Sequence, residues 1–397
     1  MYGGEGLARL PADDRGPGKA VFVPFVLPGE TVEATLREEK PGFARARLDK
    51  ILTASLRRID PQCHYFQRCG GCHYQHTDYE HQLEVKASVL KENLRRIAKL
   101  ELDTELHIHP SQPWHYRNRS RFKLQTAPEF AIGYYKFNSH ELLPVEECPI
   151  SSPLINRALA GVWQLGRVGK VPHGIEEIEF FANGDYTQLL SEVYCSSGPA
   201  DVSEPFAGEL KSTLTELSGV TFFVARSAKA GAQGDPQQLS SNGVGHLIYK
   251  TKFASYRVSA GAFFQVNRHL TDELVNIVVD GRRDARARRT AGAGGGATAT
   301  ALDLYAGVGF FSSVLNREFE RVIAVEPSPT SHADLLYNSP ANVKAVRATT
   351  EQYLENAAGN LRPGLVVVDP PRSGLGERVI KGLAKLMARR VARVVNA

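Results

Sequence analysis

The stretch ALDLYAGVGFFSSVL, residues 301–315, reads as a buried strand, a tight glycine turn and the start of a helix. Gly307 and Gly309 permit the turn and let the backbone approach a ligand closely. The next apolar run, RVIAVEPS, ends in Glu326, seventeen residues after Gly309. Because an acidic side chain at that place can accept hydrogen bonds from both hydroxyls of a ribose, the pattern predicts a nucleoside-binding site.

Two further features indicate which nucleoside this is. A dinucleotide fingerprint usually carries a third glycine, and Ser312 stands at that position. The combination favours S-adenosylmethionine over NAD. A later apolar strand ends in LVVVDPPRSGLG, which places Asp369 at the carboxyl end of the strand, where ligands of open α/β sheets bind. Pro370 and Pro371 give this loop a rigid, non-helical exit.

The surrounding sequence predicts an α/β fold. The runs ATALDLY, RVIAVE, NVKAV and LVVVD alternate with helical segments, which is typical of a doubly wound, mostly parallel Rossmann-like sheet. Upstream, residues 31–37 and 44–51 alternate apolar and polar side chains, as in a small β domain. We expect three domains: a β-barrel over 1–54, a central, mostly β domain over 55–260 containing a helix over 80–100 that packs on the last domain, and the Rossmann-like domain over 261–397 with a flexible insertion near 281–300.

Cysteines are concentrated in one short stretch. The chain has five cysteines, and QCHYFQRCGGCHYQ holds Cys63, Cys69 and Cys72. In a chain without a secretion signal such a cluster indicates a metal site rather than disulfides. A fourth ligand is needed, and the candidates are Cys148, in a turn before a proline, and Cys195, at the end of an apolar strand. Spacing does not separate zinc from iron–sulfur, but the single C-x2-C pair favours a cluster.

Cations and rings alternate in the central region. HYRNRSRFKLQ and FAIGYYKF interleave basic with aromatic side chains, and the basic candidates for RNA contact are Arg117, Arg119, Arg121 and Lys123. Cations bind phosphates and rings stack on unpaired bases, so a single-stranded RNA surface needs this mixture. Alternating strands also produce it by chance. The net charge of +5 permits an anionic partner without requiring one.

The sequence contains no apolar run long enough to span a membrane and no secretory leader at its N-terminus. We expect a cytoplasmic protein with no membrane partner.

Taken together, the motifs resemble the RNA uracil-C5 methyltransferases, most closely the branch that modifies 23S ribosomal RNA. GGEGLARL with VFVPFVLPGETV is similar to that branch's TRAM domain, and YFQRCGGCHYQH with EECPI is similar to its iron–sulfur segments. GAFFQVN, DLYAGVG and DPPRSGLG are similar to its methyltransferase motifs. The resemblance covers nearly the whole chain.

The resemblance implies roles for particular residues. It implies a [4Fe-4S] cluster on Cys63, Cys69, Cys72 and Cys148, and S-adenosylmethionine contacts from Gln265, Tyr305, Glu326 and Asp369. Phe263 and Gln265 would lie near a flipped uracil, with Asp369 and Gln265 supporting the active site. The family's reaction uses a cysteine thiolate that adds to uracil C6 and a general base that removes the C5 proton. The family further implies RNA as partner and a monomeric protein.

The final residues depart from the family pattern. The resemblance places the nucleophile in a V-S-C-D-P-type segment just beyond the fifth strand, and the base farther on. The fifth strand is VARVVNA, the sequence stops at Ala397, and no cysteine follows Cys195. We therefore expect a C-terminally truncated chain with an incomplete sheet, able to bind cofactor but inactive in methyl transfer on its own.

Other functions remain open. The same chemistry on transfer RNA is one, although a barrel and a cluster together argue against it. A non-catalytic iron–sulfur RNA-binding protein is another, and retained cofactor affinity without transfer would favour it. An amino-methyltransferase is disfavoured because Arg372, not an aromatic residue, follows Asp-Pro-Pro.

Overall fold

The computed structural model describes residues 3–10, 18–196, 200–224, 236–279, 300–357, 361–387 and 394–396. The chain forms two compact units, which we describe separately. The N-terminal unit comprises residues 1–113 with 132–149, and the C-terminal unit comprises 114–131 with 150–397.

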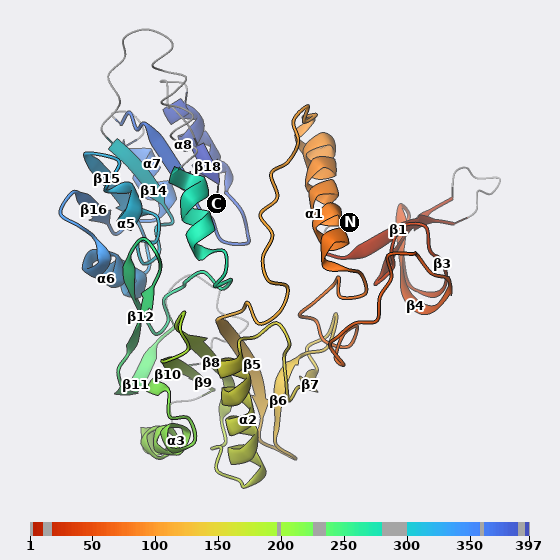
Figure 1. Cartoon of the computed structure of the whole chain (residues 1–397), viewed down its shortest axis with the longest axis horizontal. Coiled ribbons are helices and arrows are strands. Elements are labelled where there is room, and N and C mark those ends of the chain that lie inside the picture. The colour runs from red at the N-terminus through yellow and green to blue at the C-terminus, as the bar shows by residue number, and fades with distance from the viewer. Residues whose placement is uncertain are drawn as a thin grey trace. The chain divides into compact units, whose positions relative to one another are not determined.

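The N-terminal unit begins with a four-stranded sheet in the order β1-β2-β4-β3 (Figure 1). Its strands are β1 (Glu5–Arg9), β2 (Ala20–Pro24), β3 (Thr31–Glu39) and β4 (Phe43–Thr53). In β4 the side chains alternate as the sequence predicts: Ala44 and Ala46 are buried and pack with Val21 and Val23, whereas Arg45 and Arg47 are exposed. The predicted small β domain is confirmed.

The cysteine-containing loop, residues 55–78, follows this sheet. After it come α1 (Tyr79–Asn93) and one π-helical turn, η1 (Leu94–Ala98). Asp78 caps α1 by accepting a hydrogen bond from the backbone N–H of His81 at 2.8 Å. The unit also holds a hairpin of β6 (Ala131–Tyr135) and β7 (Leu142–Pro144).

The C-terminal unit contains a mixed sheet in the order β11-β10-β9-β8-β5. Its strands are β5 (Arg119–Gln125), β8 (Ile175–Ala182), β9 (Leu189–Cys195), β10 (Leu217–Val224) and β11 (Gln238–Gly243). Two helices belong to the same region, α2 (Pro153–Arg167) and α3 (Ala200–Thr213), followed by the hairpin β12 (His246–Lys250) and β13 (Ser255–Ser259).

The second sheet of this unit is entirely parallel, in the order β16-β15-β14-β17-β18. Its strands are β14 (Thr300–Leu304), β15 (Arg321–Val325), β16 (Val343–Val346), β17 (Leu365–Val368) and β18 (Val394–Asn396). The chain runs outward from β14 through β15 to β16 and then returns to the other side of β14 for β17. This reversal confirms the doubly wound α/β fold and opens a switch point at the carboxyl end of β14.

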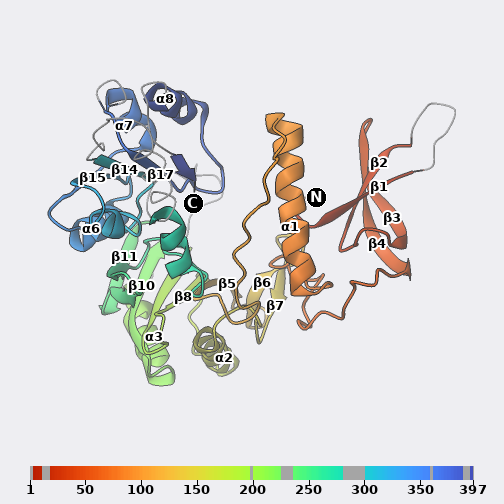
Figure 2. The same ribbon diagram turned by 45° about the horizontal axis from the view of Figure 1, so that its top comes forward.

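Helices cover both faces of the parallel sheet (Figure 2). Alternate strand residues such as Leu302, Ile323 and Val366 pack on α7 (Thr350–Ala357) and α8 (Glu377–Met387). The opposite face packs on residues 271–279, on α5 (Ser312–Leu315) and on α6 (Pro329–Asn338). Buried strands with apolar side chains on both faces explain their near-continuous hydrophobic sequences.

Several expectations can now be compared with the structure. The helix expected over 80–100 is present, but α-helical geometry ends at Asn93 and η1 continues only to Ala98. The central region is less exclusively β than expected, since it also holds α2 and α3. The insertion near 281–300 lies outside the described residues except for Thr300, and the three-domain division stays a prediction. Among the described residues, no helix has the length and apolar character needed to cross a membrane.

Candidate functional site

The glycine turn after β14 has the backbone geometry that its sequence predicts. Tyr305, Gly307 and Gly309 adopt φ values of 62°, 55° and 89°. A Cβ on Gly309 would lie 2.8 Å from Cδ1 of Leu335, so a side chain does not fit there. No atom lies within 4 Å of the corresponding position on Gly307, which leaves open space beside the backbone. Close approach of a ligand is therefore possible at Gly307.

Glu326, directly after β15, is fastened to this turn. Its carboxylate accepts hydrogen bonds from the backbone N–H groups of Gly307, at 2.9 Å, and of Ser328, at 2.8 Å. The side chain is mostly buried. A carboxylate offers about four acceptor sites, and these two bonds fix its orientation. The acid and the glycine turn are thereby one structural element, as ribose recognition requires.

Asp303, in β14, lies beneath the turn and is fully buried. Its Oδ2 accepts a hydrogen bond from the Ser312 hydroxyl at 2.5 Å, while Oδ1 has no partner within the described part of the chain. Burial raises the pKa of Asp303 to about 7, and the charges of Asp369 and Glu326 contribute to the rise. Three carboxylates thus converge near one end of the parallel sheet.

The segment 261–266 supplies a second wall. Its side chains alternate: Ala262 and Phe264 are buried, whereas Phe263 is 59% exposed. Phe264 packs against Tyr249 with ring centroids 4.6 Å apart. Anchoring by Phe264 explains why the neighbouring side chains, Phe263 and Gln265, project from the opposite side of the extended backbone.

Gln265 and Asp369 meet at the switch point. The Gln265 amide Nε2 donates to Asp369 Oδ2 at 3.1 Å. Burial raises the pKa of Asp369, and the bond from Gln265 opposes that rise. The structure therefore brings together residues 104 positions apart in the sequence.

Residues at the start of β5 hold the same segment. The Asn118 side-chain amide donates to the Gln265 carbonyl at 3.0 Å, and its backbone N–H donates to Val266 at 3.0 Å. The Arg119 guanidinium donates to the Ala262 carbonyl, and Glu192 accepts from the Gly261 N–H at 2.8 Å.

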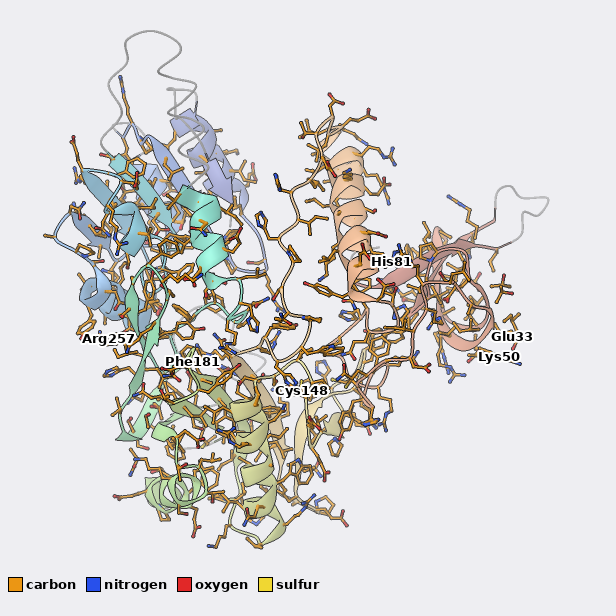
Figure 3. All side chains as sticks on the ribbon, viewed as in Figure 1. Glu33, Lys50, His81, Cys148, Phe181 and Arg257 are labelled. Carbon is orange, nitrogen blue, oxygen red and sulfur yellow. The ribbon has the colours of Figure 1, made fainter. Side chains whose placement is uncertain are left out.

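Arg119 is itself buried in a charge network. It pairs with Glu179 and, at 2.6 Å, with Glu192, and it lies 5.2 Å from the centre of the Phe181 ring, which Figure 3 labels. These contacts give Arg119 a supporting role beneath segment 261–266.

Two other basic candidates for RNA contact lie on β5, and both have acidic partners. Arg121 pairs with Glu179 at 2.6 Å and lies over the Tyr194 ring, and Lys123 pairs with Glu177. The Nε of Arg117 is buried without a hydrogen-bond partner in the described structure. Direct RNA contact by these residues stays a prediction.

The cysteine loop of the N-terminal unit is joined by hydrogen bonding to the segment that carries Cys148, which Figure 3 labels. The backbone of Cys69 donates to the Tyr65 carbonyl at 2.7 Å, and the Tyr65 hydroxyl accepts from the Glu146 N–H at 3.1 Å. Burial raises the pKa of the Cys63, Cys69 and Cys72 thiols, to about 11 for Cys72, and the negative charge of Cys148 contributes to all three shifts. The four thiols are close enough to influence one another.

All five cysteines are reduced thiols. Across the described ranges, no group of three or more His, Cys, Asp or Glu side chains is arranged to hold a metal ion. Cys195, the alternative fourth ligand, is fully buried in β9 of the other unit. Burial raises its pKa to about 11, which makes it a poor nucleophile.

Some site residues could not be chosen from the sequence. Asp303 precedes the glycine turn by four positions, but its burial depends on how helices cover the sheet. Asn118 and Glu192 act through hydrogen bonds to segment 261–266, which lies far along the chain. Of the residues that hold this segment, the sequence indicates only Arg119, and as a candidate for RNA contact. Local motifs carry no signal for such long-range support.

Comparison with known proteins adds two family matches. The family model described as tRNA (Uracil-5-)-methyltransferase matches residues 78–391, and the TRAM domain model matches residues 2–48. A protein of Aquifex aeolicus named "Uncharacterized RNA methyltransferase" is 31% identical over 94% of this chain and 82% of its own length. One of Thermotoga maritima with the same name is 28% identical over 99% of this chain and 87% of its own.

A solved structure shows the same fold. The crystal structure of Pyrococcus abyssi tRNA (uracil-54, C5)-methyltransferase in complex with S-adenosyl-L-homocysteine has a TM-score of 0.66 and 20% sequence identity, and it covers 96% of this chain and 88% of that chain. At this level of identity the likeness shows the fold alone, and the choice between ribosomal and transfer RNA stays a prediction.

Proposed function

Because the chain belongs to the tRNA (uracil-5-)-methyltransferase family, we propose that it uses S-adenosylmethionine to methylate C5 of a uridine in RNA. The resemblance of its cysteine segments to those of the branch that modifies 23S ribosomal RNA makes that RNA the proposed target. The observation that carries the cofactor assignment is the pair of hydrogen bonds joining Glu326 to the glycine turn and to Ser328.

The residues around the switch point fit this cofactor. Gly307 leaves room beside the backbone, and Glu326 is oriented to accept hydrogen bonds from ribose hydroxyls. The charges of Glu326 and Asp369 make the site negative, which favours a cationic ligand, while the raised pKa of Asp303 leaves that carboxyl partly protonated at neutral pH. S-adenosylmethionine, when bound, supplies an electrophilic methyl group on a positively charged sulfonium. Tyr305 lies in the same turn and is a further candidate contact.

The uracil side of the site is formed by segment 261–266. Phe263 is exposed and can stack on an unpaired base, whereas Gln265 has an amide that can hydrogen-bond a uracil edge. The Gln265–Asp369 bond holds this amide beside the cofactor residues. A uracil must leave its helix to reach such a pocket. We assign the thiolate that attacks C6 to none of the described residues, since Cys195 is buried and the other four cysteines are the proposed cluster ligands.

For Cys63, Cys69, Cys72 and Cys148, we propose a [4Fe-4S] cluster. The donor set supports this proposal: the four residues are free thiols, and they lie on adjoining segments of one unit. In such a cluster each thiolate bonds a different iron, so its four sulfurs stand farther apart than around one metal ion. A structural role for this centre requires no redox partner.

A cofactor-binding experiment tests the proposal first. Calorimetry with S-adenosylmethionine should show binding to the 397-residue chain and at least tenfold weaker binding to Glu326→Gln, since a hydrogen bond to a charged group contributes about 1.5–3 kcal/mol. Absence of binding by the unchanged chain would refute the assignment.

The RNA target is tested by transfer of labelled methyl groups to unmodified 23S ribosomal RNA and, in parallel, to transfer RNA. Methyl groups on C5 of a uridine in 23S RNA support the proposal, whereas transfer only to transfer RNA would establish the second candidate, which the fold match favours. Cofactor binding without transfer to either RNA would contradict the proposed reaction.

A further inference from the structure

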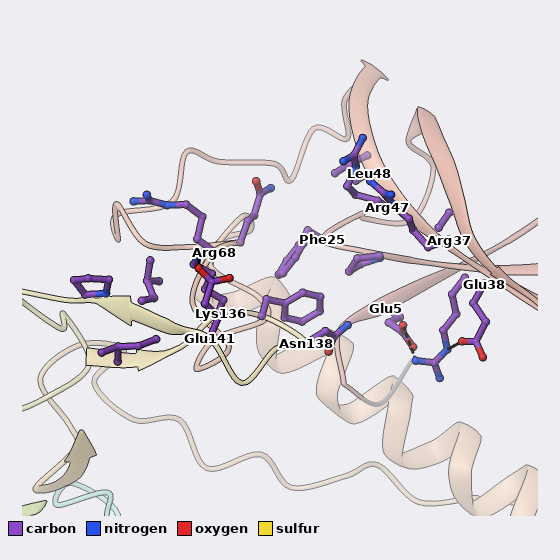
Figure 4. A pocket seen from close by; sticks show the side chains of 18 residues that line it. Glu5, Phe25, Arg37, Glu38, Arg47, Leu48, Arg68, Lys136, Asn138 and Glu141 are labelled. Atoms are coloured by element: carbon purple, nitrogen blue, oxygen red, sulfur yellow. Dashed lines mark hydrogen bonds and ion pairs between the residues drawn. The ribbon is translucent and has the colours of Figure 1, made fainter. Parts of the chain in front are cut away.

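Charged side chains are placed differently in the two units. In the N-terminal unit, charged side chains that are mostly exposed line a groove of about 1160 Å³ (Figure 4). Arg45, for example, lies 3.6 Å from Glu5 and 3.8 Å from Glu38 while its side chain stays 49% exposed, and ion pairs of this kind contribute little to stability. In the C-terminal unit, by contrast, the side chains of Arg119 and Glu192 are only 11% and 3% exposed. This buried pair needs an explanation, because apolar side chains of similar volume are often at least as stable in such a place.

The buried charges form a ladder across β5, β8 and β9. Strand register places Arg121 opposite Glu179, and Glu179 opposite Glu192. Two carboxylates that face each other repel, and Arg119 pairs with both of them, with Glu192 at 2.6 Å. The charge ladder therefore ends at Glu192.

Glu192 also binds backbone outside the sheet. Its Oε1 accepts from the Gly261 N–H at 2.8 Å as well as from Arg119, and its Oε2 accepts from the Tyr194 hydroxyl at 2.6 Å. Arg119 in turn donates to the Ala262 carbonyl. The two charges of one ion pair thus hold a donor and an acceptor of adjacent residues. The segment that these residues begin lies outside the strands, so its buried backbone groups need side-chain partners.

The other end of this segment has its own anchor. The Asn118 amide donates to the Gln265 carbonyl at 3.0 Å. Between the two anchors, the Gln265 side chain leaves the segment and donates to Asp369 at 3.1 Å. Gly261 and Gln265 are only four positions apart. A shift of the backbone at Gly261 should therefore change how Gln265 approaches Asp369.

We propose that Glu192, held by Arg119 and Tyr194, is a positioning residue for the reaction: it fixes the start of segment 261–266 so that Gln265 meets Asp369 at the cofactor site. The inference rests on the proposed function and adds to it a residue outside the glycine turn and outside the segment itself. Because Glu192 acts through one backbone hydrogen bond, a side chain that still accepts from that N–H should retain most of the effect.

Calorimetry with S-adenosylmethionine on the full chain tests this role, because Asp369 is a proposed cofactor contact. Glu192→Leu removes the acceptor for Gly261 at similar volume and should bind about tenfold more weakly, the loss expected for one hydrogen bond to a charged group. Glu192→Gln keeps an acceptor oxygen and should stay within about threefold of the unchanged chain. The matched control is Glu177→Leu, which removes a carboxylate paired with Lys123 on the same sheet and should leave cofactor affinity unchanged.

A double-substitution cycle separates positioning from general destabilisation. Gln265→Ala alone should weaken cofactor binding. The combined Glu192→Leu/Gln265→Ala variant should bind within about twofold of Gln265→Ala, because Glu192 acts through Gln265. Two losses that multiply would overturn the proposal, and so would a cofactor affinity that Glu192→Leu leaves unchanged.

Hydrogen exchange provides a measurement that needs no ligand. In Glu192→Leu the amides of residues 260–266 should exchange about tenfold faster than in the unchanged chain, whereas in Glu177→Leu their exchange should stay the same. If the unchanged chain binds no cofactor, the proposed function fails, and exchange still decides whether Glu192 fixes the segment. Faster exchange confined to residues 260–266 in Glu192→Leu supports that role, and equal exchange in the two variants overturns it.

Discussion

Asp303 should make the stability of the C-terminal unit depend on pH. Burial raises its pKa from the ordinary 3.8 to about 7. Between these values the folded state keeps a proton that the unfolded state releases, so the contribution to the free energy of unfolding is fully present below pH 3.8 and is lost as pH rises to about 7. At about 1.4 kcal/mol per pH unit, the loss amounts to about 4 kcal/mol.

The substitution Asp303→Asn should remove this dependence, because an amide keeps the acceptor for Ser312 and cannot ionise. Urea unfolding followed by tryptophan fluorescence reports on the right unit, since Trp114 and Trp163 both belong to it. Between pH 4 and pH 8, the free energy of unfolding of the Asn variant should rise by about 4 kcal/mol relative to that of the unchanged chain. Ser312→Ala should extend the dependence to higher pH, because the Ser312 hydrogen bond lowers the pKa of Asp303 and its loss raises that pKa. If the two free energies of unfolding differ by an amount that stays constant within about 1 kcal/mol over this pH range, the reasoning is refuted.

Three other substitutions give separate tests. Arg119→Met should reduce the free energy of unfolding by about 3–5 kcal/mol in urea titrations, because two carboxylates remain buried without their cation, and Arg119→Lys should lose less. Gly309→Ala should cost about 1–3 kcal/mol and weaken cofactor binding in calorimetry, whereas Gly376→Ala, whose Cβ meets nothing within 4 Å, should do neither. Cys148→Ser should at least halve the iron and sulfide content of anaerobically purified protein, and Cys195→Ser should leave it unchanged; equal content in both variants would contradict the ligand set.

The sequence was most informative where function depends on neighbouring residues. The glycine turn, Glu326 and the strand before Asp369 could be predicted because strand periodicity and glycine geometry are local properties. The parallel sheet followed from apolar runs at regular intervals.

The support of the site could not be predicted in this way. From the sequence alone, an arginine that binds RNA cannot be told from one that pairs with a carboxylate of the same protein. In the structure Arg119 pairs with Glu192, 73 residues away. The helix α2 could have been found from Ser152 as its N-cap and Pro153 at its first position, both helix-start signals.

The attachment of segment 261–266 to Asn118 and Arg119 has a consequence for folding. The hydrogen bonds involved span 147 and 143 residues, so they form only after a long intervening chain has been brought together. We therefore expect Gln265 to acquire its position late, when β5 has already joined its sheet, and a partly folded chain should not present an ordered segment 261–266. In the native state the backbone amide of Asn118, bonded to the Val266 carbonyl, and that of Gly261, bonded to Glu192, should exchange with deuterium only through large-scale opening, at rates typical of the sheet interior.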